Sequence, residues 1–350
     1  MKAAVLTEFN KPLEILNVPD PTLTPDSVIV QVKASGVCRS DLHLWQGGLS
    51  WVGFEMELPF VMGHEFCGII EEVGKDVTKF KKGDRVIVPF LHGCGSCEHC
   101  MEGNQNVCPD HIEIGATSWG GFAEYVHIPN ADTSLFHLAE EISFVEASSL
   151  GCRFTTAFHG VMDRAKVRAG EWVAVFGCGG IGLSAIQIAA STGAIVIAVD
   201  INEESLKLAK GLGAAFTING REKDPVGEIL ELTKGGVHVA IDALGRKVTV
   251  QNAIRSLRIK GRHVQIGMTT EEEQGYVPVP IDEIIMKELK VIGSYGIQSP
   301  RYPAILQMIE RKMLEPGKLV TRTISLEETG DVILEMEQNK NVGITIIDRF

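Results

Sequence analysis

The sequence predicts a protein of the α/β class, in which a domain with a doubly wound parallel sheet is joined to a β-rich domain. The chain has 350 residues, and at about 150 residues per domain this length favours two domains. From about residue 153, predicted strands alternate with helix-length amphipathic segments, a pattern typical of a parallel sheet. A glycine-rich turn joins the first such strand to the first such helix.

Residues 1–152 are expected to be rich in β-strands. Short strand-like runs at 28–33, 68–73 and 85–89 are separated by turns that contain Pro and Gly, such as residues 82–84. Residues 293–350 show no clear period and are treated as a separate C-terminal segment.

Residues 153–292 are expected to form the doubly wound domain, because strands and helices alternate there. The expected strands are 172–176, 195–200, 215–219, 237–243 and 263–267. The expected helices are 181–192, 203–212, 226–233 and 248–257.

Composition and charge exclude several classes of protein and partner. The chain is 45% apolar and 22% charged, which excludes disordered, collagen-like and coiled-coil proteins. Its net charge is −12 and no dense basic stretch occurs, so nucleic acids and anionic membranes are poor partners. The uncharged stretch 172–199 is long enough to span a bilayer, but its glycines and polar residues favour a strand, a turn, a helix and a second strand.

The first chemical signal is the turn Gly177-Cys178-Gly179-Gly180-Ile181-Gly182. Because it follows an apolar strand and opens a helix, it predicts a dinucleotide site, although a glycine-rich turn without a dinucleotide is the alternative. Gly177 permits the tight turn, Gly179 lets a pyrophosphate approach the backbone, and Gly182 lets the helix pack closely on the strand. Gly180 lies at the helix start, where the phosphates are expected.

The expected second strand ends at Asp200, a position from which a carboxylate can bind the ribose of a dinucleotide. Asp200 follows Gly177 by 23 residues, and a carboxylate there accepts hydrogen bonds from the 2′-hydroxyl and repels a 2′-phosphate. No Lys or Arg follows Asp200 until Lys207. The sequence therefore favours NAD over NADP.

Four cysteines within 15 residues predict a metal site. They are Cys94, Cys97, Cys100 and Cys108, and four thiolates on one loop can surround a tetrahedral zinc ion. The alternative is an iron–sulfur cluster, but the last gap is longer than in ferredoxins and no second cysteine set follows. Four thiolates fill the coordination shell, so this zinc is expected to be structural. The first residues contain no apolar stretch of the kind found in signal peptides, so neither secretion nor a disulfide framework is expected.

A dispersed set of residues predicts a second metal site. Cys38 begins the segment Cys38-Arg39-Ser40-Asp41-Leu42-His43, His64 and Glu65 follow Gly63, and Cys152 comes much later. Alone, each of these is more often an ordinary core residue. Two cysteines and one histidine together form the three-ligand set of a catalytic zinc site, which leaves one position open.

In these motifs and their order, the chain resembles the zinc-containing medium-chain alcohol dehydrogenases over essentially its whole length. The resemblance implies a GroES-like β-barrel catalytic domain completed by residues 293–350, and a Rossmann domain for NAD. It implies that Cys38, His64 and Cys152 hold the catalytic zinc, and that Glu65 is a nearby carboxylate able to bind the metal transiently.

The resemblance also assigns supporting roles. Asp41 would orient His64, Arg39 would contact the cofactor pyrophosphate, and Ser40 and His43 would form the proton relay. A bound zinc would acidify the alcohol, as it acidifies water. Hydride would then pass reversibly between the alcohol and NAD, which gives an aldehyde or ketone.

The resemblance extends to assembly and location, and it also reveals departures. The length resembles that of shorter, tetrameric members of the family, so a homotetramer is favoured over a dimer, and a cytoplasmic location is expected. Ile344 stands where many members have an arginine that binds pyrophosphate, and Arg153 after Cys152 is bulkier than expected. Phe90 is expected to line the substrate pocket, as is Trp51, for which ordinary loop packing is the alternative.

Two other classes of protein compete with the dehydrogenase interpretation. An electron-transfer protein would carry a cluster in the loop 94–108, and a nucleotide-binding structural protein would have no turnover. The second has no need of the proton relay at Ser40 and His43.

Overall fold

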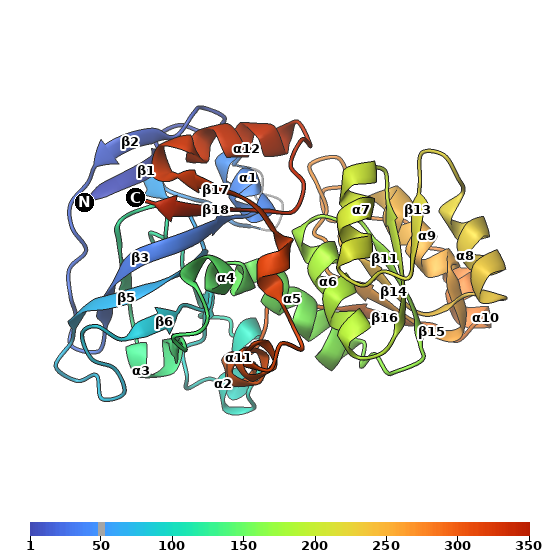
Figure 1. Cartoon of the computed structure of the whole chain (residues 1–350), viewed down its shortest axis with the longest axis horizontal. Helices are drawn as coiled ribbons and strands as arrows, with labels where there is room; N and C mark the ends of the chain where they lie inside the picture. The colour runs from blue at the N-terminus through green and yellow to red at the C-terminus, as the bar shows by residue number, and fades with distance from the viewer. Residues whose placement is uncertain (48–52) are drawn as a thin grey trace. The chain divides into compact units, whose positions relative to one another are not determined.

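A computed structural model of the chain describes residues 1–47 and 53–350. It divides into two compact units, one formed by Met1–Cys152 with Gly296–Phe350 and the other by Arg153–Tyr295 (Figure 1). The second unit extends three residues beyond the expected boundary at 292, because a short strand at 290–293 pairs with its sheet. No helix in the described part of the chain is long and apolar enough to cross a membrane.

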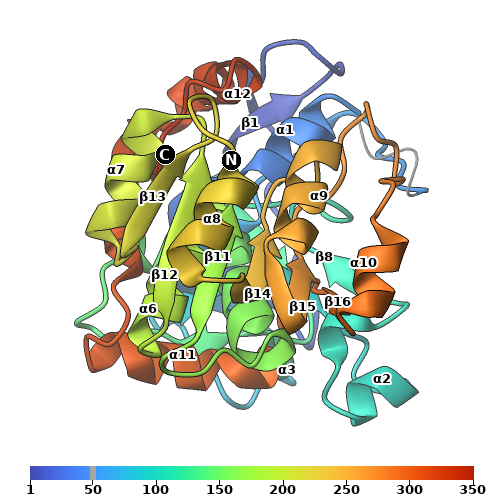
Figure 2. The same cartoon turned by 90° about the vertical axis from the view of Figure 1, so that its right-hand side faces the viewer.

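The second unit contains a six-stranded parallel sheet in the order β13-β12-β11-β14-β15-β16 (Figure 2). This is the doubly wound order 3-2-1-4-5-6, in which ligands bind where the order reverses, at the carboxyl ends of the first and fourth strands. The predicted α/β fold class is confirmed. The strands are β11 Trp172–Phe176, β12 Ile195–Asp200, β13 Phe216–Asn219, β14 Val237–Asp242, β15 Leu257–Gln265 and β16 Lys290–Gly293. The helices are α5 Thr155–Phe158, α6 Gly180–Ser191, α7 Glu203–Gly211, α8 Pro225–Thr233, α9 Lys247–Arg255 and α10 Ile281–Met286.

Local sequence explains why these helices begin where they do. Asn202 precedes α7, and its side chain accepts hydrogen bonds from the amides of Glu204 and Ser205. Asp224 caps α8 in the same way, and Pro225 occupies the first helical position, where its missing N–H costs nothing. The stretch 172–199 forms β11, α6 and β12, so the alternative of a membrane span is wrong for it.

One expected strand boundary in this unit is wrong. We expect a strand from 263, but β15 begins at Leu257, six residues earlier. The first half of the strand carries exposed, mostly charged side chains, and Lys260 has a φ of 60°. Its register against β14 also shifts between Val237 and Val239. An irregular, polar half-strand gives no alternating apolar pattern, so sequence periodicity does not detect it.

The first unit is built around a seven-stranded sheet in which β10-β6-β5-β3-β18-β17 are neighbours and β9 also pairs with β3. A three-stranded sheet β2-β1-β4 and a pair β7-β8 complete the β-structure. The strands are β1 Lys2–Leu6, β2 Glu14–Asn17, β3 Val28–Val37, β4 Phe60–Val61, β5 Glu65–Val73, β6 Arg85–Ile87, β7 Leu91–His92, β8 Ile112–Glu113, β9 Tyr125–Ile128, β10 Phe136–His137, β17 Val320–Ser325 and β18 Ile344–Arg349. The helices are α1 Arg39–Trp45, α2 Glu98–Met101, α3 Ala131–Ser134, α4 Phe144–Ser148, α11 Tyr302–Glu310 and α12 Thr329–Glu337.

The C-terminal segment is ordered and belongs to the first unit. Strand β18 pairs antiparallel with β3, with Thr345 opposite Val37 and Ile347 opposite Ser35. Ile346 and Ile347 are fully buried, so the segment contributes to the core as well as to the sheet. Strand β3 therefore lies between β5 and the end of the chain, and it leads directly into α1.

Candidate active site and zinc sites

The start of α1 joins three of the predicted site residues. Cys38 is the N-cap residue of α1, and its backbone N–H donates to Asp41 Oδ2 at 2.7 Å. The other oxygen of Asp41 lies 3.1 Å from His64 Nδ1. Both partners are essentially inaccessible to solvent, at 0% and 1% exposure. One buried carboxylate thus fixes the backbone of Cys38 and the ring of His64.

His64 presents an unsatisfied nitrogen toward the other predicted ligands. Its Nε2 atom is buried and has no hydrogen-bond partner among the described residues, which is costly unless another ligand fills the position. Burial disfavours the charged ring, but the Asp41 carboxylate outweighs it and raises the pKa of His64 well above its usual value. Asp41 thus orients the imidazole through Nδ1, and a metal ion would take the place of the proton on Nε2, as in metal-bound histidines.

Two glycines allow the backbone to pack closely around His64, Glu65 and Cys152. Gly63 has a φ of 99°, and a Cβ there would lie 2.7 Å from the backbone nitrogen of Phe122. Gly151 lies in the π-helical turn Leu150–Phe154, and a Cβ there would lie 2.4 Å from Glu65 Cβ. Glycine at 151 therefore lets the chain pass against Glu65 immediately before Cys152.

Cys38, His64, Glu65 and Cys152 form one cluster. Each offers a ligand atom, and these atoms all lie within 4.8 Å of one another. The neighbouring Cys38 thiol and burial raise the pKa of Cys152 well above its usual value, so a cation is needed to hold both sulfurs as thiolates. Two thiolates, an imidazole and a carboxylate suit zinc. The donor set and the orphaned Nε2 atom fit the predicted metal.

The predicted relay and cofactor residues on α1 lie beside this cluster. Ser40 Oγ is 3.7 Å from Cys38 Sγ, and Ser40 is half-buried. His43 is also half-buried, and its pKa is lowered by burial and by the positive charge of Arg39. Arg39 is exposed, and its Nη1 donates to Asn339 Oδ1 at 3.2 Å.

The four-cysteine loop also forms a compact cluster. The sulfurs of Cys94, Cys97, Cys100 and Cys108 all lie within 4.8 Å of one another, and those of Cys97 and Cys108 are 3.7 Å apart. Zn–S bonds of about 2.3 Å in a tetrahedron place the sulfurs about 3.8 Å apart. A single ion therefore fits, whereas a cluster with several irons and sulfides needs cysteine sulfurs that lie farther apart.

Backbone amides favour thiolates in this loop. The amide of Cys97 donates to the sulfur of Cys94, that of Cys100 to Cys97, and that of Cys94 to Cys108. Hydrogen bonds from Ser96 and Cys97 lower the pKa of Cys94 to about 6, whereas burial raises the pKa of Cys100 to about 12. A metal cation would bring all four sulfurs to the thiolate form together.

Replacing Cys97 with serine is expected to remove about one zinc per chain and to lower the thermal stability of the protein. Zinc contributes ~10–16 kcal/mol in isolated finger peptides, and much less of this should be visible in a large domain. Metal analysis and calorimetry of the Cys97→Ser protein provide the measurement. An unchanged zinc content together with full stability would show that the loop binds no metal.

The glycine-rich turn has the shape that a dinucleotide site needs. Gly177 has a φ of 94°. A Cβ at Gly182 would lie 1.7 Å from the carbonyl oxygen of Gly177, and a Cβ at Gly179 would meet nothing within 4 Å. The turn is therefore tight at its start, closely packed at Gly182 and open at Gly179. Gly180 begins α6, and a Cβ there would lie 2.3 Å from Arg153 Cδ.

Asp200 ends β12, and its carboxylate is held by backbone amides. Oδ2 accepts from the amide of Cys178, and Oδ1 accepts from those of Ile201 and Asn202 at 2.7 and 2.9 Å. The carboxylate is thus fixed beside the glycine-rich turn. This geometry leaves further lone pairs for a ribose hydroxyl.

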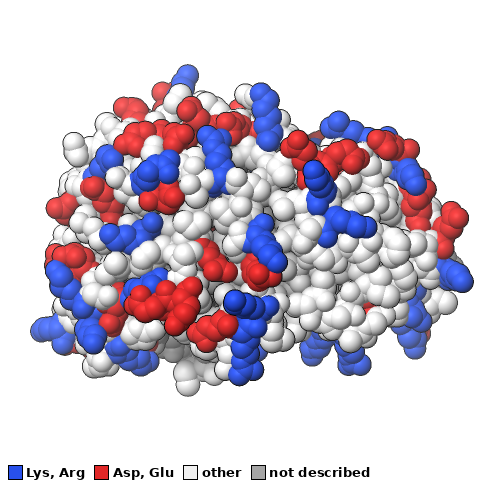
Figure 3. Space-filling model, in the orientation of Figure 1, with Lys and Arg blue, Asp and Glu red and all other residues white. Residues whose placement is uncertain are grey.

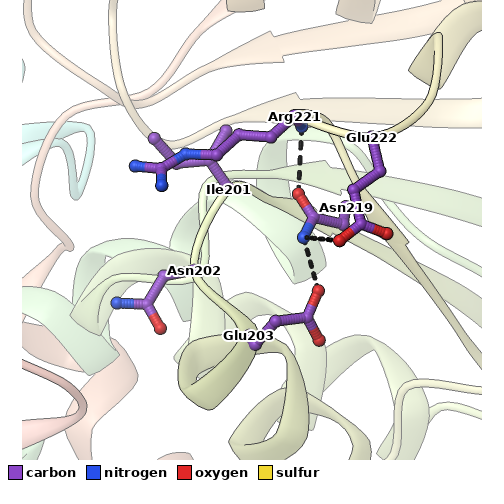
Figure 4. A pocket seen from close by; sticks show the side chains of 6 residues that line it. All are labelled: Ile201, Asn202, Glu203, Asn219, Arg221 and Glu222. Atoms are coloured by element: carbon purple, nitrogen blue, oxygen red, sulfur yellow. Dashed lines mark hydrogen bonds between the residues drawn. The ribbon is translucent and has the colours of Figure 1, made fainter.

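A pocket of about 380 Å³ lies next to Asp200 (Figure 4). The Asn219 amide in this pocket donates to Glu203 and Glu222, and the side chain of Arg221 extends toward Ile201. Sequence reasoning missed Arg221, because it considered only the residues that directly follow Asp200. The sequence could have indicated Arg221, because residues that follow neighbouring parallel strands lie at the same sheet edge. The lining residues are Ile201, Asn202, Glu203, Asn219, Arg221 and Glu222.

The remaining predicted residues are also placed. Phe90 is 3% exposed and its ring lies 6.0 Å from that of His64, whereas Trp51 lies outside the described residues. Ile344 is fully buried in β18.

Two further cysteines, Cys67 and Cys178, are buried thiols whose pKa is raised by burial. Neither belongs to the two metal clusters found among the described residues.

Comparisons with known proteins identify the family of the chain. The chain matches the alcohol dehydrogenase GroES-like domain family over residues 24–139 and the zinc-binding dehydrogenase family over residues 180–311. An alcohol dehydrogenase of Geobacillus stearothermophilus is 37% identical over 348 residues, which cover 99% of this chain and 98% of the relative. An NAD-dependent alcohol dehydrogenase of Sulfurisphaera tokodaii is 33% identical over 354 residues, which cover 99% of each chain.

Solved structures lead to the same result. The alcohol dehydrogenase of Aeropyrum pernix superposes with a TM-score of 0.90 at 33% identity, covering 99% of this chain and 100% of that one. The GroES-like and Rossmann folds that the resemblance implies are confirmed. The chain therefore belongs to the zinc-containing medium-chain alcohol dehydrogenase family.

Proposed function

We propose that this protein reversibly oxidises an alcohol to an aldehyde or ketone with NAD, at a zinc ion held by Cys38, His64 and Cys152. The observation that carries the proposal is the buried, unpartnered Nε2 atom of His64, which is clustered with two thiols and a carboxylate within 4.8 Å. The enzyme is an NAD-dependent oxidoreductase whose cofactors are zinc and NAD. A second zinc belongs to the four-cysteine loop.

The protein supplies the geometry and the proton path. Zinc at this site would act as a Lewis acid toward the alcohol or carbonyl oxygen of the substrate. Asp41 accepts a hydrogen bond from Nδ1–H of His64 and so directs Nε2 toward the cluster. Glu65 supplies a further carboxylate oxygen that can transiently join the ligand set.

Proton release is assigned to Ser40 and His43. Ser40 lies beside Cys38, so its hydroxyl can accept the proton that the substrate loses. Burial and Arg39 lower the pKa of His43, so the ring is neutral at pH 7 and can take the proton onward. The link between the two side chains is assigned to the ribose of the bound cofactor, as the family resemblance implies.

Cofactor binding is assigned to the glycine-rich turn, Asp200 and Arg39. Gly177, Gly179, Gly180 and Gly182 shape the turn that would hold the pyrophosphate, and the amides at the start of α6 would donate to it. Asp200 would bind the adenosine ribose, and Arg39 would contact the pyrophosphate.

The function is tested by offering primary, secondary, cyclic and aromatic alcohols with NAD and with NADP, and by following the reduced nicotinamide. We expect turnover with at least one class of alcohol, a preference for NAD and about two zinc ions per chain in a colourless protein. A brown protein that contains iron would instead support electron transfer. Two zinc ions with no turnover across the whole panel would contradict the assigned activity.

We also propose that the protein is a cytoplasmic homo-oligomer, with a tetramer favoured over a dimer. Strand β16 is an edge of its sheet among the described strands, and Val291 on it is 53% exposed. The adjoining α10 exposes Ile281, Ile285 and Met286 at 56–75%. An exposed apolar edge of this kind pairs readily with a second copy, and light scattering measures the mass. The cytoplasm is proposed because its reducing conditions keep the eight cysteines from forming disulfides.

Small molecules fit the surface better than nucleic acid or lipid. Lys and Arg side chains are intermixed with Asp and Glu over the face drawn in Figure 3. The net charge of −12 adds long-range repulsion toward polyanions. The proposed partners are therefore the alcohol, its carbonyl product and further copies of the chain.

A further inference from the structure

Asp242 is a fully buried carboxylate that the proposed mechanism does not use. It is the last residue of β14 and is 0% exposed. Its Oδ1 atom accepts from the amides of Leu244 and Gly245 at 2.6 and 3.0 Å, and its Oδ2 atom accepts from the Thr249 hydroxyl at 3.0 Å. Neutral donors offset only part of the cost of burying a carboxylate, and burial raises the pKa of Asp242. A charged group kept at this cost calls for a reason.

The hydrogen bonds to Asp242 fix the turn 243–245, which follows β14. Gly245 has a φ of 75°, and a Cβ there would lie 2.0 Å from the carbonyl oxygen of Met268. A Cβ at Gly267 would lie 2.3 Å from the amide nitrogen of Leu244. The turn is therefore packed against the backbone that follows β15, and it has little room to shift.

The side chain of Leu244 lies against the first glycine of the glycine-rich turn. A Cβ at Gly177 would lie 2.5 Å from Leu244 Cγ, and Leu244 remains 37% exposed. Strands β11 and β14 are neighbours (Figure 2), so the turns that follow them lie side by side. Leu244 is thus a partly exposed apolar side chain at the point where the strand order reverses, which is where ligands bind in sheets of this kind.

The strand order indicates which half of NAD would meet this side chain. Asp200, to which the adenosine ribose is assigned, ends β12 on one side of β11. Leu244 follows β14, on the other side of β11. A dinucleotide that crosses the glycine-rich turn with its adenosine over β12 therefore has its nicotinamide half over β14.

We propose that Asp242 is a positioning residue for the cofactor: its carboxylate holds the turn 243–245 so that Leu244 forms an apolar wall for the nicotinamide half of NAD. This inference rests on the proposed function, because it assumes that NAD binds on the glycine-rich turn. Asp242 is fully buried and acts through the amides of Leu244 and Gly245 rather than by touching the cofactor.

The test measures equilibrium binding of NADH and of AMP to the zinc-loaded protein by calorimetry. AMP contains the adenosine half alone, so its affinity does not depend on the wall. Asp242→Ala removes every acceptor atom of the side chain. Asp242→Asn keeps one oxygen for the two amides and places its NH₂ group beside Thr249, whose hydroxyl can donate to the carbonyl of Arg246 instead. Leu244→Ala removes the wall itself.

Asp242→Ala and Leu244→Ala are each expected to weaken NADH binding about tenfold, the effect of covering part of a leucine side chain. AMP binding should change less than about twofold in both. Asp242→Asn should bind both ligands within about threefold of the wild type. The double variant should bind NADH about as well as Leu244→Ala alone, because two residues that act through one contact are not additive.

Glu171→Ala is the matched control. The Glu171 carboxylate belongs to the same unit and also accepts from a backbone amide, that of Arg168, and from a side chain, Arg262 Nη2 at 2.6 Å. Glu171 precedes β11 and so lies at the amino ends of the strands, away from the glycine-rich turn. Its loss should lower Tm and leave the affinities for NADH and AMP unchanged.

Distinct outcomes overturn the inference. Unchanged NADH binding by folded Asp242→Ala would exclude a positioning role, and equal losses for NADH and AMP would show that Asp242 only supports the fold. Additive losses in the double variant would show that Asp242 does not act through Leu244. If Asp242→Ala does not fold, Leu244→Ala decides, because a partly exposed side chain can be shortened without unfolding and its NADH affinity must fall while its AMP affinity stays. A wild-type protein that binds neither ligand would instead overturn the proposed cofactor, and this inference with it.

Discussion

Replacing Ser40 with alanine is expected to slow alcohol oxidation by about 10²–10⁴-fold, the usual contribution of a positioned acid–base group. The hydroxyl lies 3.7 Å from Cys38 Sγ, next to the proposed metal, where it would take the proton directly from the substrate. Zinc content and NADH affinity should stay nearly unchanged, because Ser40 is not one of the clustered ligands. Single-turnover kinetics with a deuterated alcohol measures the chemical step.

The His43→Gln change should have a smaller effect, below the lower end of that range. His43 stands at the outer end of the relay, where water can substitute for it. Its pKa is lowered by burial and by Arg39, so in the wild type the neutral, proton-accepting form persists to lower pH than in an unperturbed histidine. The loss in the variant should therefore be largest below pH 7, where solvent bases are scarce. The pH profile of kcat/KM measures this difference.

The order of the two effects distinguishes a relay from two residues that merely support α1. A structural role predicts loss of zinc or of thermal stability in both variants, with no particular pH dependence. Near wild-type turnover of Ser40→Ala, under conditions where hydride transfer limits the rate, would show that the proton leaves by another path.

Replacing Asp200 with glycine is expected to reduce the preference for NAD over NADP by about a hundredfold. The Asp200 carboxylate is fixed by three backbone amides, so it cannot easily turn away from a 2′-phosphate. Like charges brought together cost several kcal/mol, and each 1.4 kcal/mol corresponds to a factor of ten. The ratio of kcat/KM values for the two cofactors is the measurement, and a wild-type preference for NADP would contradict the role of Asp200.

Arg221 provides an internal control for this interpretation. Its side chain lines the pocket beside Asp200 (Figure 4) and has no ion-pair partner among the described residues. An arginine there should attract the 2′-phosphate that Asp200 repels, so Arg221→Gln should sharpen the preference for NAD. In the double variant with Asp200→Gly, the gain in NADP activity should become smaller than in Asp200→Gly alone.

The sequence predicted best those parts of the fold that depend on local pattern. The ranges of β11 and β12 agree with the expected strands, because uninterrupted apolar runs are bounded by glycine and aspartate. The predicted start of β15 lies after the observed one, because the exposed first half of the strand carries charged side chains. Strand β16 was missed because four residues at a sheet edge carry too short a pattern.

The candidate sites likewise differ in whether their residues are close together or far apart in the sequence. Cys94–Cys108 could be recognised from spacing alone, because the ligands lie on one loop. Cys38, His64 and Cys152 needed a known family pattern, since three separate segments bring them together. Arg221 could not be assigned from the residues next to Asp200 alone, because it follows the neighbouring strand β13 and reaches the same sheet edge only in the fold.

The pairing of β18 with β3 has a consequence for the order of events during synthesis. The second unit is one uninterrupted stretch, so it can fold as soon as it leaves the ribosome. Strand β3, which leads into Cys38, has to wait for a partner made more than 300 residues later. Until that partner arrives, the end of β3 has an open edge, because β9 pairs only with Val28–Gln31. Such edges are prone to mispairing between nascent chains. The zinc site should therefore form late in synthesis. Its formation should depend on chaperones and should be impaired when the last few residues are removed.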